Sequence, residues 1–188
     1  MGRWEPNSEQ RFLVAAIELF GEIGFERTTV AAIAQRAGLT ARTFFRYFAD
    51  KREVLFNGSE QLQKTMVDAL AGAPAEASPV DAVAAALAKA ADFFNEERRP
   101  FARVRNAVIA ANPELHEREL IKLATLSAAL AAALRERGVD GPDASLAAEA
   151  GMAVFRVAFM QWVSESEQRG YGEIVDESLA RLRALAGG

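Results

Sequence analysis

The chain of 188 residues contains no cysteine and a single histidine, His116. Without thiols it has neither a disulfide framework nor a thiolate zinc site, and one histidine cannot build a transition-metal cluster. A glycine-rich phosphate loop and a Gly-x-Ser-x-Gly nucleophile motif are also missing. These absences predict a protein that is not an enzyme and that uses no cofactor or metal.

Long apolar runs are missing as well. The first ten residues, MGRWEPNSEQ, have no apolar core of the signal-peptide type, and no later run approaches the length of a membrane span. We therefore expect a cytoplasmic protein without a membrane partner. With 51% hydrophobic residues the chain can still bury a substantial core.

The net charge of −4 is small, but it is unevenly distributed along the chain. Residues 1–52 contain eight Lys and Arg against six Asp and Glu, a balance of +2, whereas the remainder contains fourteen against twenty, a balance of −6. A weakly basic N-terminal part can bind nucleic acid only if its cations gather on one face. The acidic remainder is expected to stay away from DNA.

Helical spacing of apolar residues and abundant alanine predict an all-α fold, and no segment alternates in the manner of a strand. Helix starts are marked by pairs such as Ser78-Pro79 and Asn112-Pro113, in which a cap precedes proline at the first helical position. Caps and breakers together predict nine helices. We expect two domains, an N-terminal three-helix domain over residues 1–52 and a C-terminal helical domain over residues 53–188.

The segment 28–55 has the spacing of a helix-turn-helix. Either Thr28 or Thr29 can cap its first helix, and Gly38 can end that helix because glycine tolerates a left-handed backbone. Thr40 is then placed to cap the second helix. A small residue, a glycine and a buried apolar residue at these intervals predict two closely crossing helices.

The second helix exposes an unusual face. At 100° per residue Phe44 and Phe48 point inward together, and the outward face and its flank carry Arg42, Thr43, Phe45, Arg46 and Tyr47. Arg42 can donate two hydrogen bonds to guanine, and Phe45 can pack on a thymine methyl group. The alternative is a small three-helix core whose arginines are merely solvated.

The next helix is predicted to open with a capping box, Asp50 to Glu53. Its N-terminal amides together with Lys51 suit a DNA phosphate. We expect this helix to continue to about Leu70 as a rigid connector, followed by a loop that reaches Pro79. In front of the first helix, which Asn7 or Ser8 can cap, Arg3 and Trp4 lie in a short arm.

The N-terminal segment resembles the DNA-binding domain of TetR-type repressors. The matching features are LF..IGF, TTV..IA..AGLT, the aromatic run FFRYF and an acidic cap with Lys51. The variant TFFRYF is similar to an actinobacterial branch that includes regulators of acyl-thioester and redox-cofactor metabolism. The resemblance implies a nine-helix TetR-like architecture, a homodimer, a double-stranded DNA operator and a cavity for a small effector. Residues 1–52 would then form the helix-turn-helix DNA-binding domain and residues 53–188 the effector-binding and dimerisation domain.

The resemblance also implies which residues contact DNA. Ala41, Arg42, Thr43 and Phe45 correspond to base-contacting positions, and Thr29, Tyr47 and Lys51 correspond to phosphate contacts. Thr40 and Arg46 complete the predicted DNA-binding set. Position 45 is usually tyrosine in the family, so Phe45 lacks a hydroxyl that would make a polar contact there.

The segment from Asp143 to Gln168 is apolar nearly all round, unlike a surface helix with one apolar stripe. It must be covered on two sides, so we predict a homodimer that pairs this helix and the last helix with their two-fold mates. The predicted interface residues are Val154, Val157, Ala158, Gln161, Leu179 and Leu182. A monomer with a thick core is the alternative.

Aromatic and apolar residues of the C-terminal domain form the predicted effector pocket. They are Phe94, Phe101, Arg105, Val108, Leu123, Phe155, Phe159 and Trp162. Arg103, Arg105 and Arg156 lie among apolar residues, where an unpaired buried arginine would be costly. Each of them pairs with an acidic ligand group, pairs with an acid such as Glu149, or is exposed.

Two functions from different classes follow. The first is a ligand-responsive repressor that binds a palindromic operator as a homodimer and is released by a small hydrophobic or acidic-headed effector. The second is a DNA-tethered interaction protein, of an architectural or nucleoid-associated kind, whose C-terminal domain binds another protein.

Overall fold

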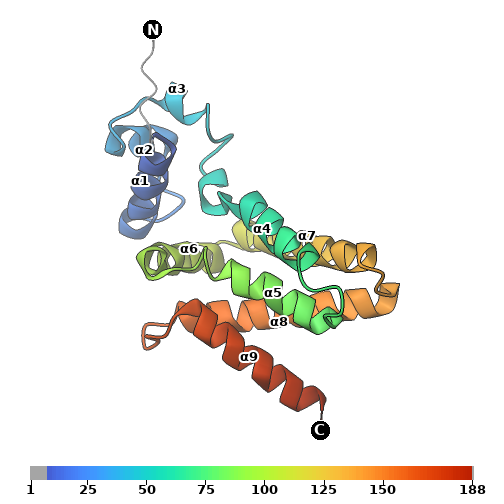
Figure 1. Ribbon diagram of the computed structural model, residues 1–188. Helices are drawn as coiled ribbons and strands as arrows, with labels where there is room; N and C mark the ends of the chain where they lie inside the picture. Colours follow the sequence, from blue (N-terminus) through green and yellow to red (C-terminus); the bar gives the residue numbers. More distant parts are fainter. Residues whose placement is uncertain (1–7, 188) are drawn as a thin grey trace. The chain divides into compact units, whose positions relative to one another are not determined.

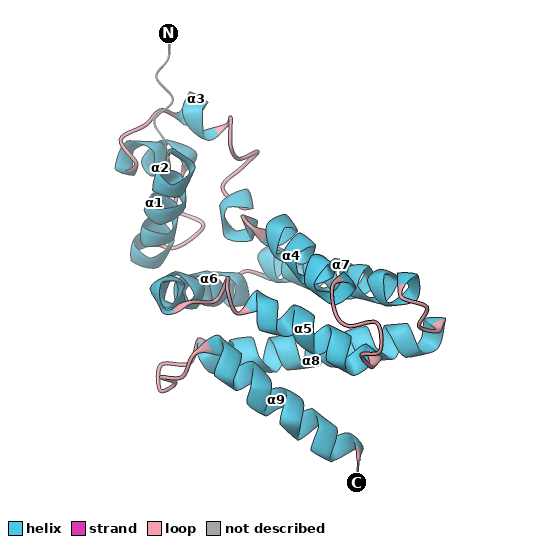
Figure 2. Ribbon diagram, in the orientation of Figure 1, coloured by secondary structure: helices cyan, strands magenta, loops and turns pink. Residues whose placement is uncertain are grey.

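The computed structural model describes residues 8–187, and within this range it contains nine α-helices and two short 3-10 helices but no strand (Figure 2). The all-α prediction is thus confirmed for the described residues. The arm with Arg3 and Trp4, and the cap Asn7, lie outside them. The α-helices are α1 (Ser8–Ile23), α2 (Val30–Arg36), α3 (Ala41–Phe44), α4 (Ser59–Ala71), α5 (Pro79–Ala90), α6 (Arg99–Ala111), α7 (Pro113–Glu136), α8 (Gly141–Trp162) and α9 (Tyr171–Ala186).

The chain divides into two compact units. The N-terminal unit combines Met1–Asn57 with Val104–His116, and the C-terminal unit combines Gly58–Arg103 with Glu117–Gly188. Helices α6 and α7 therefore contribute residues to both units.

An aromatic core holds the N-terminal unit together. Phe12 of α1 is fully buried and meets Phe44 edge to face, with ring centroids 5.2 Å apart. Phe48 lies 5.2 Å from Phe44 and 6.4 Å from Phe12. Such rings bury large apolar areas, so α3 is fixed to α1 through its inward face.

The predicted continuous connector from Lys51 to about Leu70 is wrong. The 3-10 helix η1 (Glu53–Phe56) ends at Asn57, Gly58 has φ +82°, and α4 begins only at Ser59. A left-handed residue interrupts the helical hydrogen-bond ladder. Asn-Gly is a common turn dipeptide, so the sequence carries the signal for this break.

In the C-terminal unit α5 packs against α4, α8 and α9, and α8 also packs against α9 (Figure 1). Ser78 caps α5 and Pro79 opens it, as predicted. The buried face of α5 is mostly alanine, with Val83 and Leu87 among its small residues. Gly151 of α8 faces Val83 so closely that a Cβ at position 151 would lie 2.2 Å from a Val83 methyl group. Small side chains therefore set the spacing between α5 and α8.

Two arginines of α6 hold the loop between α8 and α9. Arg99, which is buried, donates to the carbonyl oxygens of Glu167 (2.7 Å) and Arg169. Arg103 donates to the carbonyl oxygens of Val163 (3.0 Å) and Ser164 (2.8 Å). Cations at a helix C-terminus satisfy its free carbonyl groups, so Arg103 fixes the end of α8 and Arg99 fixes the loop that follows it.

Across the described residues, no helix is both long enough and apolar enough to cross a membrane.

Candidate nucleic-acid interface

The turn between α2 and α3 has the geometry of a helix-turn-helix. Gly38 has φ +64°, its N–H donates to Gln35 O (3.0 Å), and the N–H of Leu39 donates to Ala34 O (2.9 Å). This pair of bonds is the Schellman motif, which ends a helix at a left-handed glycine. The backbone N–H of Thr43 donates to the Thr40 hydroxyl (3.1 Å), so Thr40 caps α3 as predicted.

Helix α3 is short, but turn-type hydrogen bonds continue in the residues that follow it. The N–H groups of Tyr47 and Phe48 both donate to Phe44 O, at 2.9 and 3.0 Å. Phe44 and Phe48 are 0% and 4% exposed. The predicted inward orientation of these two aromatic residues is confirmed.

The opposite face of this segment reaches solvent. Phe45 is 58% exposed, although its ring also packs edge to face with that of Phe44. Arg42 is exposed and makes no hydrogen bond or ion pair with any of residues 8–187, and Arg46 stacks over Tyr47 at 5.6 Å. Ala41, Thr43 and Tyr47 are half-buried. The predicted residues 41–43 and 45–47 are thus all exposed or half-buried.

The threonines of the predicted set also have structural roles. Thr29 caps α2 by accepting the N–H of Ala32 (3.1 Å). Thr40 and Thr43 share a hydrogen bond between their hydroxyl groups (2.9 Å). A hydroxyl is one donor and two acceptors, so capping does not exclude a bond to phosphate.

Lys51 has a different environment from the one expected of a phosphate contact. Its ammonium group donates to three backbone carbonyl oxygens of the loop before α2, those of Phe25 (2.7 Å), Glu26 (3.3 Å) and Thr28 (2.9 Å). It also lies 4.3 Å from the centre of the Phe25 ring. Because an ammonium group has three N–H donors, this loop can engage all of them.

Other cations of the N-terminal unit have internal partners too. Arg36 forms ion pairs with Glu18 (3.1 Å) and Glu22 (2.6 Å) of α1, and its hydrogen bond lowers the pKa of Glu22 below its usual value. Arg52 pairs with Asp50 at 2.9 Å. These ion pairs connect elements within the unit, whereas Arg42 of the predicted set is exposed and has no ion pair with any of residues 8–187.

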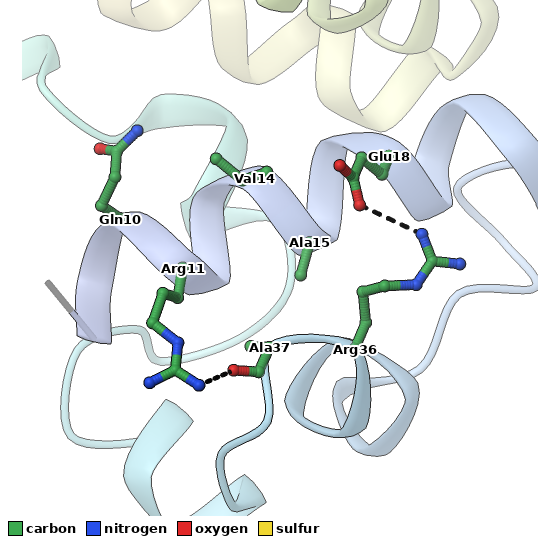
Figure 3. Close-up of a pocket in the computed structure, with 7 residues that line it drawn as sticks. All are labelled: Gln10, Arg11, Val14, Ala15, Glu18, Arg36 and Ala37. Atoms are coloured by element: carbon green, nitrogen blue, oxygen red, sulfur yellow. Dashed lines mark hydrogen bonds and ion pairs between the residues drawn. The ribbon is translucent and has the colours of Figure 1, made fainter.

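An open hollow of about 390 Å³ lies on the N-terminal unit between α1 and the end of α2. Figure 3 shows that two of its lining residues connect these helices, because Arg11 reaches the carbonyl of Ala37 and Arg36 reaches Glu18. The sequence did not point to Arg11, because its partner lies 26 residues away and no local pattern marks the pair. The complete lining is Gln10, Arg11, Val14, Ala15, Glu18, Arg36 and Ala37.

Half of the predicted effector-pocket residues meet in one aromatic cluster of the C-terminal unit. Phe94 lies within 5.7 Å of Phe155, Phe159 and Trp162, and 4.6 Å from Tyr171, ring centre to ring centre. The Tyr171 hydroxyl donates to Phe155 O (3.3 Å), and burial raises its pKa. Sequence reasoning missed Tyr171 because it follows Gly170 at the very start of α9.

The other predicted pocket residues lie elsewhere. Phe101 and Leu123 are half-buried in the C-terminal unit, and Leu123 packs against its core. Arg105 and Val108 belong to the N-terminal unit. There Arg105 donates to Leu55 O (2.5 Å) and stacks over Phe56 at 5.4 Å.

The three arginines that the sequence places among apolar residues have two kinds of environment. Arg103 and Arg105 are held by backbone carbonyl groups, and Arg156 is exposed on α8. Glu149, the carboxylate considered as a partner, instead accepts the Ser127 hydroxyl at 2.6 Å.

The predicted dimer residues divide between the core and the surface of the C-terminal unit. Val154, Ala158 and Leu179 are buried within the unit itself, at 4%, 0% and 7% exposure. Gln161 and Leu182 are half-buried, and Val157 is 59% exposed. Among the described residues, no group of three or more histidine, aspartate or glutamate side chains could hold a metal ion.

The N-terminal fold and the exposed face of α3 define a class, that of helix-turn-helix DNA-binding proteins. In that class the start of the second helix of the motif meets base edges in the major groove. Here Arg42 lies in the first turn of α3, and Phe45 is the residue that ends the helix.

Comparison with known proteins gives the family. Residues 12–57 match the model of bacterial regulatory proteins of the tetR family, and residues 77–186, more than half of the chain, match that of the MftR C-terminal domain. The chain belongs to the tetR family of bacterial transcriptional regulators.

Two relatives and one solved structure illustrate the similarity. TcmR, an HTH-type transcriptional regulator of Streptomyces glaucescens, is 39% identical over 71 residues, 38% of this chain and 31% of TcmR. MftR, the mycofactocin biosynthesis transcriptional regulator of Mycobacterium tuberculosis, is 32% identical over 115 residues, 61% of this chain and 58% of MftR. The matches thus span less than two thirds of either relative. FadR of Thermus thermophilus, a TetR-family repressor solved with lauroyl-CoA, shares the fold with a TM-score of 0.55 at 24% identity, over 93% of each chain.

Proposed function

We propose that this protein binds a palindromic operator as a homodimer, represses transcription there and is released by a small effector. The proposal rests on the outward face of α3 and the residue that follows it. Arg42 is exposed and Phe45 is 58% exposed, so both can reach base edges. Phe44 packs on Phe12 of α1 and holds the helix on its inner side. Two recognition helices about 34 Å apart fit two half-sites one DNA turn apart.

A row of exposed apolar side chains on α8 supports the homodimer. Leu146, Val157 and Met160 are 69%, 59% and 56% exposed. Val157 and Met160 follow Leu146 by eleven and fourteen residues, which places all three on one face of the helix. A two-fold mate would cover this row and complete a four-helix bundle from α8 and α9 of each copy. Val157→Asp is expected to give a monomer by light scattering and to lose operator binding. Arg156→Ala, on the neighbouring exposed surface, is the control and should remain dimeric.

The aromatic cluster supports an apolar effector that carries a hydrogen-bond acceptor. The Trp162 indole N–H is buried and has no acceptor among residues 8–187, and a buried donor without a partner is costly. Phe94 and Phe159, both half-buried, form the outer edge of the cluster. An acyl chain would pack on these rings, and its carbonyl or carboxylate oxygen would accept from Trp162. The FadR complex with lauroyl-CoA gives a precedent for such a molecule in that protein.

The effector can be tested through Trp162 itself. The sequence has two tryptophans, so Trp4→Phe leaves Trp162 as the single indole resonance and the single tryptophan emitter. Dodecanoate or lauroyl-CoA should shift the indole N–H resonance downfield and weaken operator binding. Dodecylamine, which has no acceptor oxygen, is the matched control. Equal responses to all three probes, or none, would refute the acceptor.

The experiment for the operator is binding to the DNA upstream of the protein's own gene, measured by fluorescence anisotropy over a salt series. An unrelated duplex of the same length is the control. We expect the protein to bind as a dimer and to bind the upstream DNA more tightly than the unrelated duplex. Equal binding to both duplexes would contradict operator recognition and favour the DNA-tethered interaction protein.

A further inference from the structure

Arg11 connects the first helix to the turn of the helix-turn-helix. Its Nη2 donates to the carbonyl oxygen of Ala37 at 2.5 Å and to that of Gly38 at 3.4 Å (Figure 3). Ala37 and Gly38 are the residues at which α2 ends, and Thr40, the cap of α3, follows two residues later. A side chain of α1 thus holds the backbone immediately before the recognition helix.

The chemistry of this contact suits a fixed turn. The carbonyl groups at a helix C-terminus lack helical partners and carry partial negative charge, so a guanidinium group both bonds them and opposes that charge. Arg11 is half-buried, and Ala37 is only 6% exposed. The fit is also close, because a Cβ at position 38 would lie 2.8 Å from the Arg11 Nη2.

Lys51 likewise bonds backbone carbonyl groups, at the N-terminal end of α2. It gathers the carbonyl oxygens of Phe25, Glu26 and Thr28, in the loop directly before the helix, at 2.7, 3.3 and 2.9 Å. Thr28 is 1% exposed, and Thr29 next to it caps α2. Helix α2 is therefore anchored by one cation before its first turn and by another after its last.

We infer that Arg11 and Lys51 are positioning residues for operator recognition, which set the place of α3 through the two ends of α2 instead of contacting DNA phosphates. The inference rests on the proposed operator binding. A phosphate contact and a positioning role make opposite predictions for DNA of random sequence. Loss of a phosphate contact weakens binding to every duplex and lowers the salt slope by about 1 per contact. Loss of positioning weakens binding to the operator only.

The first test compares Arg11→Gln with Arg27→Gln. Arg27 is the matched control because it also donates to a carbonyl group at a helix C-terminus, that of Ile23 (2.6 Å), but at the end of α1. Arg11→Gln should weaken operator binding about tenfold, the loss expected for a hydrogen bond to a charged group. Its affinity and salt slope on an unrelated duplex should match those of Arg27→Gln. Lys51→Met should behave like Arg11→Gln.

A double-variant cycle separates positioning from general stability. If Arg11 acts by placing Arg42, then Arg11→Gln should cost much less in an Arg42→Ala background, because coupled sites are not additive. Equal costs in both backgrounds would mean that Arg11 only stabilises the fold. A reduced salt slope on the unrelated duplex would make Arg11 or Lys51 a phosphate contact. Either result overturns the inference.

Hydrogen exchange tests the inference without DNA. In Arg11→Gln the amides of Leu39 and Phe44, which close the turn and the first turn of α3, should exchange about tenfold faster because local opening becomes easier. Arg27→Gln should leave them unchanged, and unchanged rates in Arg11→Gln would refute the positioning role. If the wild-type protein shows no operator preference but these rates change, the proposed function fails while the anchoring of α3 stands.

Discussion

Gly151 makes the close crossing of α5 and α8 possible, and its replacement by alanine tests how tightly the C-terminal unit is packed. A Cβ at position 151 would lie 2.2 Å from Cγ1 and 3.6 Å from Cβ of Val83. Carbon atoms in contact are normally about 3.5–4.0 Å apart, so the new methyl group overlaps Cγ1 by more than an ångström. Val83 is 1% exposed, and valine in a helix has one strongly preferred rotamer. The overlap must therefore be relieved by the helices moving apart.

Two opposing effects set the magnitude for Gly151→Ala. Alanine in a helix interior is favoured over glycine by about 0.8–1.0 kcal/mol. Overpacking of a close-packed core costs about 1–3 kcal/mol. The overlap with Val83 belongs at the upper end of that range, because the side chain of a helical valine has little freedom to rotate away. The net loss is expected to be about 1–2 kcal/mol, or several degrees in Tm for a chain of this size.

Urea unfolding, followed by Trp162 emission in a Trp4→Phe background and at fixed protein concentration, measures this loss. Gly172→Ala is the control because its Cβ would meet only the Ala91 Cβ at 3.5 Å, an ordinary contact. It should be neutral or stabilising. Adding Val83→Ala to Gly151→Ala should recover part of the loss, since it removes the overlapping methyl group. An equally stable Gly151→Ala, or additive effects of the two substitutions, would refute the packing argument.

Three further expectations concern DNA binding and pH. Arg42→Ala should reduce discrimination between the operator and single-base variants by about 1–3 kcal/mol, measured by competition binding; an unchanged ranking of the variants would remove Arg42 from base contact. Thr40→Val should cost about 1 kcal/mol of stability through the lost cap, seen in thermal unfolding. Hydrogen bonds from Arg169 hold the pKa of Glu167 below its usual value. The stabilisation that ionised Glu167 gives the folded state is therefore complete above the pKa of this group in the unfolded chain, about 4.3. It is lost progressively as the pH falls from there through the lower pKa of the folded state. In Glu167→Gln the stability should decline less between pH 5 and 3, and an identical pH profile would contradict this role.

Local chemistry made much of the N-terminal unit predictable. Gly38, Thr40 and the Phe44–Phe48 pair act over a few residues, and their turn, cap and inward face are as the sequence predicts. The break at Asn57 and Gly58 was missed because the capping box before it was extended into one long helix.

Long-range geometry was not predictable in the same way. The bonds of Arg11 and Lys51 span 23 to 27 residues, and neither side chain differs in sequence from a solvated cation. Helix α8 is apolar nearly all round, so spacing alone could not tell which side packs against the core. The structure places Val154 and Ala158 inside and Val157 outside.

The internal use of cations in the N-terminal unit bears on how the protein finds its site in a genome. A chromosome offers about 10⁶–10⁹ competing sequences, and attraction to them comes from phosphate contacts. Arg36 is paired with carboxylates and Lys51 is bonded to backbone carbonyl groups of its own chain, so fewer side chains are available to form phosphate contacts on random DNA. If the protein binds an operator as proposed, fewer molecules would be held on random DNA, and fewer copies per cell would be needed to keep the operator occupied. The proposed effector would then release the regulator with less retention on neighbouring sequence.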